Sequence, residues 1–231
     1  MSTIEPSSIW VVIPAFNEAS VIADVVRSVT KYGYQVVVVD DCSRDDTFGA
    51  LAGTLAHRLR HPINLGQGAS LQTGLTYALG QGAKFLVSFD ADGQHQAQEI
   101  EALVRTLVEH NVDAALGSRF LNPASSATMP EGRRTLLKTA TAFTRLTTGL
   151  KLTDTHNGFR AFTRDAAQKL DITQNRMAHA SQILSQIASL KLRYREVPVT
   201  IAYTEYSLAK GQRATNAFNI LWESLMGRLF Q

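Results

Sequence analysis

Short runs of β-branched and other apolar residues alternate with longer stretches of helical periodicity over residues 1–118. The alternation is typical of βαβ units around a parallel sheet, and a continuous apolar strand indicates burial on both faces. We therefore expect an α/β fold with a Rossmann-like, mostly parallel sheet flanked by helices. The predicted strands are Trp10–Ile13, Gln35–Val39, Lys84–Phe89 and Asp113–Leu116, and the predicted helices are about Ala19–Thr30, Asp46–Leu59, Ala69–Ala78 and Ala97–Glu109.

The second part of the chain predicts fewer strands and more amphipathic helices. A loop rich in Pro, Ser, Ala and Gly spans Leu121–Gly132 and is a candidate mobile segment. It is followed by a basic amphipathic helix at Arg133–Leu150 and an apolar-faced helix at Ala217–Phe230. The first of these helices either packs on the core or lies on a membrane surface, and the second lies on a bilayer or binds a partner helix. A helix at Met177–Leu190 and a strand at Arg193–Ile201 complete the pattern.

Composition places the chain among ordinary globular proteins of one domain. Of the 231 residues, 45% are hydrophobic and 19% charged, which excludes disordered and fibrous classes. We find no apolar run long enough to span a bilayer and no secretory signal, so we expect a cytoplasmic protein. The single cysteine, Cys42, excludes an intramolecular disulfide and a thiolate zinc cluster, and it predicts a small packed residue rather than a nucleophile.

The net charge of +3 hides two regions of opposite sign. Residues 1–118 hold 7 Lys and Arg against 13 Asp and Glu, whereas residues 119–231 hold 16 against 7. We expect the acidic half, 1–118, to hold a divalent metal and the basic half, 119–231, to face phosphate or an anionic surface. No basic run interleaved with aromatics occurs, so we expect no nucleic-acid partner.

Polar residues follow three predicted strands directly, where ligands of open α/β sheets collect. Each acidic residue alone could be a helix cap or turn former, but three successive strand ends favour a binding site. Asp90 and Asp92 can aim two carboxylates into one space, which suits Mg²⁺ or Mn²⁺ carrying water and a diphosphate. The acidic residues at these strand ends are Glu18, Asp40, Asp41, Asp90 and Asp92.

The segment Asn64–Ala69 opens a helix with two glycines, Gly66 and Gly68. The glycines permit either close approach of a ligand or tight packing within the protein. The segment lacks the Gly-Lys-Ser/Thr ending of a P-loop, and no Gly-X-Gly-X-X-Gly follows the first strand. P-loop NTPases and dinucleotide enzymes are therefore disfavoured.

Three ordered motifs resemble those of family 2 glycosyltransferases with a GT-A fold. They are Val11-Val12-Ile13-Pro14-Ala15-Phe16-Asn17-Glu18, Val38-Val39-Asp40-Asp41-Cys42-Ser43-Arg44-Asp45 and Phe89-Asp90-Ala91-Asp92-Gly93-Gln94-His95. Within that family, Gly117-Ser118-Arg119 and Asp154-Thr155-His156-Asn157-Gly158-Phe159-Arg160-Ala161-Phe162 look most like the dolichyl- and polyprenyl-phosphate sugar synthases. The resemblance implies a single GT-A domain over residues 1–231, with the nucleotide sugar in the first half and the acceptor in the second.

The resemblance assigns residues to three groups. The metal and diphosphate would be held by Asp90, Asp92 and Gln94. The acceptor phosphate would lie near Arg119, Arg133, Arg134 and Arg160. The nucleotide sugar would contact Pro14, Asn17, Glu18, Asp40, Asp41, Gly68, Asp90, Ala91, Asp92, Ser207 and Lys210.

Two features depart from better-known members of the family. No C-terminal membrane helices follow the domain, and the Gln-X-X-Arg-Trp motif of processive polysaccharide synthases is missing. Both favour an enzyme that makes a single transfer. The segment that contains Ser207 and Lys210 resembles a flexible segment that closes over the nucleotide, although it could equally be a surface loop before the last helix.

These residues imply an inverting, metal-dependent transfer of a sugar from a UDP- or GDP-sugar to polyprenyl phosphate at the inner membrane face, for cell-envelope glycan synthesis. The lipid phosphate needs no general base, because it is already an oxyanion at neutral pH. The catalytic group would then be Asp92 with Arg119. The alternative is transfer to a sugar hydroxyl of a lipid-linked glycan, with Asp154 as the base, although Asp154 could instead order the turn at Asn157.

A third, different possibility is a non-catalytic nucleotide-sugar-binding subunit, or a nucleotidyltransferase built on a similar sheet. Membrane association would come from the amphipathic helices or from a small membrane protein.

Overall fold

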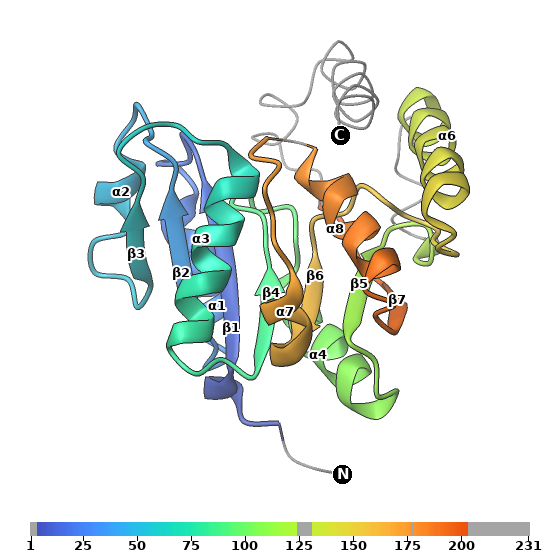
Figure 1. Cartoon of the computed structure of the whole chain (residues 1–231). Helices are drawn as coiled ribbons and strands as arrows, with labels where there is room; N and C mark the ends of the chain where they lie inside the picture. Colours follow the sequence, from blue (N-terminus) through green and yellow to red (C-terminus); the bar gives the residue numbers. More distant parts are fainter. Residues whose placement is uncertain (1–3, 124–130, 177, 203–231) are drawn as a thin grey trace.

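A computed structural model of the chain describes residues 4–123, 131–176 and 178–202. It contains one seven-stranded sheet in the order β3-β2-β1-β4-β6-β5-β7, with helices on both faces (Figure 1). The strands are β1 Ile9–Ala15, β2 Gln35–Asp40, β3 His57–Arg60, β4 Phe85–Ser88, β5 Ala114–Ser118, β6 Arg160–Thr163 and β7 Tyr194–Pro198. The helices are η1 Pro6–Ser8, α1 Ile22–Thr30, α2 Thr47–Ala50, α3 Gln67–Gly80, η2 Ala97–Glu99, α4 Ile100–Glu109, α6 Glu131–Thr148, α7 Arg164–Lys169 and α8 His179–Ser189.

The sheet is mostly parallel. β1 pairs in parallel with β2 and β4, β2 with β3, and β5 with β7. Only β6 runs against its neighbours, β4 and β5. The expected single α/β domain with a mostly parallel sheet is therefore confirmed.

Two apolar layers hold the helices on the sheet, because successive side chains of a strand point to opposite faces. Val36 and Val38 pack in one layer with α1 and α4. Val37 and Val39 pack in the other with α3, α7 and α8. The expectation that these strands are buried on both faces is confirmed.

The predicted helix Asp46–Leu59 is wrong beyond its first turn. α2 ends at Ala50, Gly53 adopts a left-handed φ of 76°, and the chain then forms the edge strand β3. The sequence of β3, His-Arg-Leu-Arg, has the period of two of a half-buried strand, and its burial alternates accordingly. The run of four residues was too short to stand out against the preceding helical pattern.

The sequence also failed to predict β6 and α7. β6 is four residues long and begins inside the motif that ends at Phe162, where no alternating pattern marks a strand. α7 begins immediately afterwards, and Thr163 caps it by accepting a hydrogen bond from the Ala166 N–H (3.3 Å). Because β6 has four residues and α7 has six, neither is long enough to stand out as a strand or a helix in the sequence.

The other helices beyond residue 118 agree with the prediction where the structure describes them. α6 and α8 match the predicted helices Arg133–Leu150 and Met177–Leu190 to within a few residues, and β7 lies inside the predicted strand. The C-terminal helix at Ala217–Phe230 lies outside the described residues. Within the described ranges, no helix combines the length and apolar character needed to cross a bilayer.

Gly74 of α3 allows this helix to lie directly on β1. A Cβ at this position would stand 2.3 Å from Cγ1 of Val12. We therefore expect Gly74→Ala to lower the free energy of unfolding by roughly 1–3 kcal/mol through overpacking. Gly80→Ala at the end of the same helix is the matched control, since nothing lies within 4 Å of its Cβ. Equal urea midpoints for the two variants would contradict the close contact.

Candidate active site

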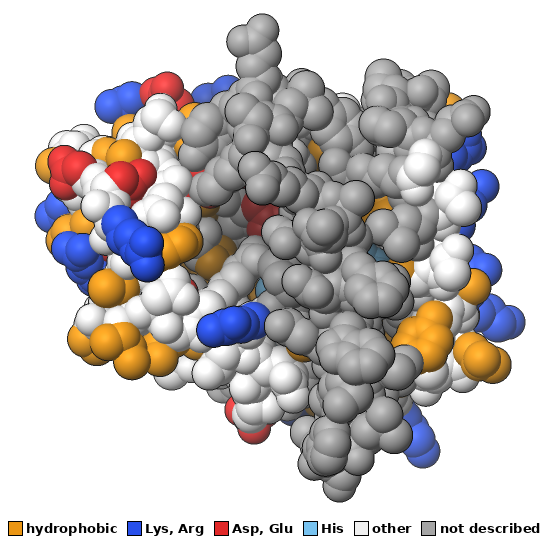
Figure 2. All heavy atoms as spheres, turned by 90° about the horizontal axis from the view of Figure 1, so that it is seen from above, with side chains coloured by type: hydrophobic (Ala, Val, Ile, Leu, Met, Phe, Trp, Pro, Cys, Tyr) orange, Lys and Arg blue, Asp and Glu red, His pale blue; other side chains and the backbone are white. Residues whose placement is uncertain are grey.

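Three parallel strands end side by side at one edge of the sheet. Ala15, the last residue of β1, lies opposite Asp40 of β2, and Val12 of β1 lies opposite Ser88, the last residue of β4. The polar segments that follow these strands therefore meet at the carboxyl edge, where open α/β sheets bind ligands. Figure 2 looks down on this edge and shows Lys and Arg side chains on both its left-hand and its right-hand rim, the latter being the side where α6 lies in Figure 1.

The loop after β1 is hydrogen-bonded to the loop after β2. Asn17, with a left-handed φ of 57°, donates its N–H to Oγ of Ser43 (2.9 Å) and accepts the Arg44 N–H on its own Oδ1 (2.8 Å). Glu18 is buried, and its N–H donates to Oγ1 of Thr47 (2.8 Å). The structure thus brings Asn17 and Glu18 together beside the end of β2, next to the half-buried Pro14.

Asp40 holds the loop that follows β2. Its carboxylate is fully buried, accepts the Ser43 N–H (3.0 Å) and forms an ion pair with Nε of Arg60 on β3 (3.1 Å). The structure therefore does not present this predicted nucleotide contact at the surface. A buried charge needs such partners, so Asp40 has a structural use that its sequence position did not reveal.

Asp41 organises the start of α3. Its two carboxylate oxygens accept the N–H groups of Leu65 (2.9 Å) and Gly66 (2.6 Å), and Oδ1 also contacts Nδ1 of His61 (2.8 Å). His61 is itself held at its other ring nitrogen by Oγ1 of Thr73 (3.0 Å). Sequence analysis did not find His61, because no motif spacing connects it to Asp41.

The glycines at the start of α3 serve tight packing. A Cβ on Gly68 would lie 2.1 Å from the carbonyl oxygen of Gln174, and one on Gly66 would lie 2.2 Å from that of Asn175. The Gly68 N–H donates to the same Asn175 oxygen (2.8 Å). Of the two possibilities that the sequence left open, the structure supports packing, here against the segment before α8.

Asp90 and Asp92 follow β4 and differ in their surroundings. Asp90 contacts Nε2 of His95 through Oδ2 (2.9 Å) and Nε2 of Gln67 through Oδ1 (3.2 Å). Asp92 accepts the backbone N–H of Gln94 within its own loop (3.0 Å). His95 of the same loop and Gln67 at the start of α3 therefore both contact Asp90, whereas the contact to Asp92 comes from its own loop.

The pKa values of these two carboxyls are displaced in opposite directions. Burial and the nearby charge of Asp90 raise the pKa of Asp92. Burial would also raise the pKa of Asp90, but the hydrogen bond from His95 and the charges of His95, His179 and Arg160 outweigh it and lower that pKa. Asp92 thus resists ionisation beside the ionised Asp90. A cation bound between the two carboxylates would relieve the repulsion of their negative charges.

The donor set at this place fits a hard divalent cation that brings other ligands with it. Among the described residues, no three His, Cys, Asp or Glu side chains converge as a metal site. Two carboxylates with substrate phosphate and water match the coordination of Mg²⁺ and Mn²⁺, not that of zinc. Ala91 between them is buried, and Gln94 is half-buried in the same loop.

Arg119 and Asp154 form a buried ion pair at the end of β5. Nε and Nη2 of Arg119 donate to the two carboxylate oxygens (2.7 and 2.8 Å), and the Arg119 N–H adds a third hydrogen bond (3.1 Å). Burial would raise the pKa of Asp154, but the Arg119 hydrogen bonds and charge lower it. Asp154 also accepts the His156 N–H (3.2 Å), which supports the turn-ordering role that the sequence left open.

Arg160 lies near the Arg119–Asp154 pair, because the charge of Asp154 acts on the pKa of Arg160 and both arginines act on the pKa of His156. Arg160 is buried and donates to the carbonyl oxygens of Asn157 (3.0 Å), Ala180 (3.2 Å) and Thr155 (3.3 Å), and burial lowers its pKa to about 10. The guanidinium of Arg160 therefore braces the turn before β6.

Four predicted residues lie at or beyond the limits of the description. Arg134 is exposed on α6. The side chain of Arg133 is outside the described part of the structure, as are Ser207 and Lys210 altogether. Their assignments stay predictions.

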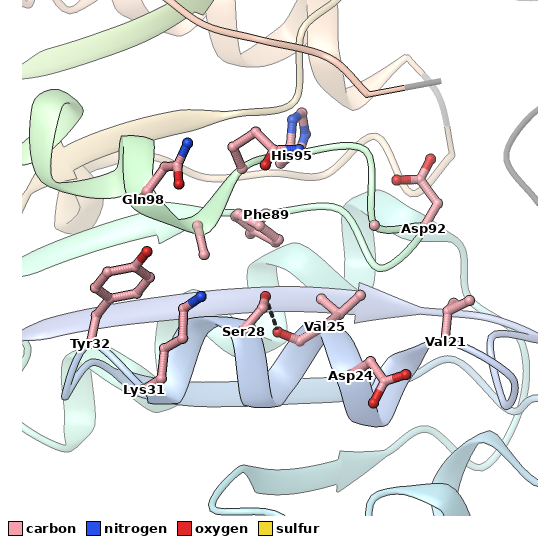
Figure 3. Close-up of a pocket in the computed structure, with 13 residues that line it drawn as sticks. Val21, Asp24, Val25, Ser28, Lys31, Tyr32, Phe89, Asp92, His95 and Gln98 are labelled. Atoms are coloured by element: carbon pink, nitrogen blue, oxygen red, sulfur yellow. Dashed lines mark hydrogen bonds between the residues drawn. The ribbon is translucent and has the colours of Figure 1, made fainter. Parts of the chain in front are cut away.

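A cavity of about 360 Å³ lies between α1 and the loop that follows β4 (Figure 3). Val25 and Phe89 form part of its apolar lining, and Asp92 and His95 line the side of the loop. The sequence gave no sign of this cavity, because its two walls come from elements about 70 residues apart.

Comparison with known sequences identifies the family. The sequence model of glycosyl transferase family 2 matches residues 10–171, and the chain belongs to this family. The expected class of enzyme, a glycosyltransferase, is confirmed.

Three curated relatives match most of the chain. An uncharacterised protein of Methanocaldococcus jannaschii is 34% identical over 233 residues, which cover 100% of this chain and 96% of that protein. UDP-N-acetylglucosamine–dolichyl-phosphate N-acetylglucosaminyltransferase of Methanococcus voltae is 30% identical, with coverage of 94% and 95%. Polyprenol monophosphomannose synthase of Mycolicibacterium smegmatis is 32% identical, with coverage of 90% and 82%.

The fold is also that of solved glycosyltransferases. A crystal structure of glucosyl-3-phosphoglycerate synthase from Mycobacterium tuberculosis matches with a TM-score of 0.73 at 18% identity, over 94% of this chain and 75% of that one. The expected GT-A fold is confirmed.

The Arg119–Asp154 pair leads to a prediction about stability. In Asp154→Asn the buried guanidinium loses its counter-charge, so we expect the free energy of unfolding to fall by about 3–5 kcal/mol. Because the folded pKa of Asp154 lies below the ordinary 3.8, the ion pair contributes fully above that pH and is lost as the pH falls through the folded pKa. Urea unfolding at pH 7 and at lower pH measures both effects.

The exposed Asp24, whose side chain is 81% accessible, supplies the control Asp24→Asn. A stability difference between Asp154→Asn and the parent that does not shrink at acid pH would contradict the ion pair.

Proposed function

We propose that the protein transfers a sugar from a UDP- or GDP-sugar to a polyprenyl phosphate, with inversion at the anomeric carbon and with Mg²⁺ or Mn²⁺. The observation that carries this proposal is the Arg119–Asp154 pair. Asp154 is the carboxylate that a hydroxyl acceptor would need as a base, yet its two oxygens are engaged by Arg119 (2.7 and 2.8 Å). An acceptor that is already an oxyanion has no need of that base.

The relatives support an acceptor of this kind. Two of them are named for transfer to dolichyl phosphate and for the synthesis of polyprenol monophosphomannose. The Mycobacterium tuberculosis structure, which shares the fold, contains Mn²⁺ and UDP. These names support a lipid phosphate and a divalent cation for this chain too.

The proposed reaction is a single displacement. An oxygen of the lipid phosphate forms the new bond to the anomeric carbon while the bond from that carbon to the diphosphate oxygen breaks, and the electron pair leaves with the nucleoside diphosphate. When bound, the divalent cation neutralises the charge that develops on the leaving diphosphate. Asp90 and Asp92, with Gln94, would hold the diphosphate end, while Pro14, Asn17, Glu18 and Asp41 line the nucleoside side.

The acceptor phosphate needs cations that can reach solvent. Arg134 on α6 is exposed, in contrast to the buried Arg119 and Arg160. We therefore assign first contact with the phosphate to α6, with Arg133 and Arg134, and electrostatic support from beneath to Arg119 and Arg160.

The transfer is tested with purified protein, Mg²⁺ or Mn²⁺ and labelled UDP- and GDP-sugars, with and without undecaprenyl phosphate in detergent. We expect metal-dependent label in the organic phase with one donor. Asp92→Ala should lower that rate by about 100-fold or more, because transition-state charge on the diphosphate loses its support, whereas Asp165→Ala at an exposed position of α7 should not.

Label that enters only an added glycan acceptor would contradict the proposal and favour the hydroxyl reaction. Release of pyrophosphate instead of nucleoside diphosphate would indicate a nucleotidyltransferase.

We further propose that the protein meets the lipid at the inner membrane surface through α6. Ala140 and Thr144 of this helix are buried, whereas Leu146 is 85% exposed and Lys138, about two turns earlier, is exposed as well. The helix thus packs on the protein with small residues and turns an apolar and basic side outward.

Sedimentation with vesicles of anionic lipid tests this surface. Reversal of one lysine removes and then opposes an attraction of about 1 kcal/mol, so Lys138→Glu should weaken binding roughly tenfold or more at low salt. Lys169→Glu on α7 carries the same change of charge on an exposed residue of another helix and is the control. Equal weakening by both variants would argue against α6.

A further inference from the structure

His95 is a buried residue at the end of the third motif, and the sequence assigned it no role at the site. Its side chain is 3% exposed and lies beside two aromatic rings, with centroid distances of 4.8 Å to Phe159 and 5.3 Å to Phe89. Figure 3 shows His95 on the loop after β4, next to Phe89. The backbone of the loop is fixed as well, since His95 forms an antiparallel bridge with Ile201.

One ring nitrogen of His95 has a hydrogen-bond partner within the described residues, and the other has none. Nε2 lies 2.9 Å from Oδ2 of Asp90. Nδ1 is buried and has no hydrogen-bond partner within the described residues. A buried polar atom without a partner costs free energy, and a phenyl ring would fill the same aromatic setting without that cost. The contact from Nε2 to Asp90 therefore accounts for a histidine at this position.

The carboxylate of Asp90, whose side chain is 33% accessible, is contacted from two further directions. Gln67 at the first turn of α3 reaches Oδ1 (3.2 Å). Gly158 lies against the other oxygen so closely that a Cβ there would stand 2.9 Å from Oδ2. Gly158 is held in turn by Oγ of Ser88, which donates to its carbonyl oxygen (2.5 Å). With both oxygens contacted and one flank closed by backbone, Asp90 has little freedom to rotate.

We infer that His95 is a positioning residue that sets the orientation of the Asp90 carboxylate and, through it, the place where the nucleoside diphosphate and its cation bind. This inference rests on the proposed function. Groups that orient ligands of a cation from behind typically contribute 10- to 100-fold to its affinity. Gln67 adds a weaker restraint, because its contact is longer and its side chain is only half-buried.

Three substitutions separate the hydrogen bond from the packing of the ring. His95→Phe keeps an aromatic ring against Phe159 and loses the donor. His95→Gln loses the ring but can place an amide N–H as many bonds from the backbone as Nε2. His95→Asn is polar but too short to reach Asp90. His110→Phe, at the exposed end of α4, is the matched control.

The readout is the binding of Mn²⁺ in the presence of UDP and of GDP, measured by the loss of the free-ion signal in electron paramagnetic resonance. We expect His95→Phe and His95→Asn to weaken Mn²⁺ binding by about 10-fold or more, and His95→Gln to stay within about threefold of the parent. Thermal unfolding of each variant shows whether it is folded. Gln67→Met, at a half-buried surface position, provides a second measurement with a smaller expected loss.

Two results would overturn the inference. One is parental Mn²⁺ affinity in His95→Phe, and the other is an equal loss in the Gln and Phe variants, which would mean that the ring and not the donor matters. If the parent itself binds no Mn²⁺ with either nucleotide, the proposed metal-dependent transfer fails first. The two failures are thus distinguishable.

Discussion

The site depends on one constraint: a carboxylate that the sheet buries at its carboxyl edge must be given hydrogen-bond donors. Asp40, Asp41 and Asp154 are buried, and the side chain of Asp90 is 33% accessible. Each carboxylate is contacted by a group at least 20 residues away in the chain, and these groups are Arg60, Gly66, Arg119 and Gln67 for Asp40, Asp41, Asp154 and Asp90 respectively. These donors come from segments that the strands of the sheet do not themselves hold together, such as the end of β3 and the start of α3. The hydrogen bonds to the carboxylates therefore also connect those segments. The polar residues at the carboxyl edge of the sheet therefore form one hydrogen-bonded network. The network is rigid because leaving any one of its buried polar groups without a partner would cost free energy.

Asp92 is the exception in this network, and the exception is informative. Within the described residues, its carboxylate accepts one hydrogen bond, from the Gln94 N–H in its own loop. Burial and the nearby charge of Asp90 raise its pKa. Donors from the protein would stabilise its charge, as they do for Asp90. A carboxylate left in this state is best stabilised by something that the protein binds. This contrast suits a pair of carboxylates that binds a cation. Asp90 is held in a fixed position by its hydrogen-bond partners, and Asp92 carries a charge that a bound cation would stabilise.

The sequence predicted the strands at the site and the acidic residues after them, because both rest on local patterns: continuous apolar runs and polar residues directly at their ends. It could not predict that Asp40 points inward to Arg60, or that Arg119 and Asp154 pair. Those contacts join residues 20 and 35 positions apart. The local pattern of a single sequence does not predict which residues so far apart come into contact. His61 was missed for the same reason, since it lies 20 positions from Asp41. His95 lies five positions from Asp90 inside one motif, but the motif does not show that its ring turns back to that carboxylate. The short elements β3, β6 and α7 were missed because each has six residues or fewer and so at most two periods, too few to stand out from the neighbouring pattern.

The position of β6 changes how the two oppositely charged parts of the chain relate. Net charge changes sign after residue 118, which suggested one half for the nucleotide sugar and another for the acceptor. In the sheet, however, β6 from the later part inserts between β4 and β5 of the earlier part and runs antiparallel to both. The turn before β6 thereby brings Gly158 against Asp90, and Arg160 lowers the pKa of the same carboxyl. The basic part thus supplies a wall and a charge to the acidic site, and the change in net charge along the chain does not mark a boundary in space. The distribution of charge along the chain indicated an acidic and a basic set of residues. The order of the strands in the sheet decides which residues of the two sets lie together at the site.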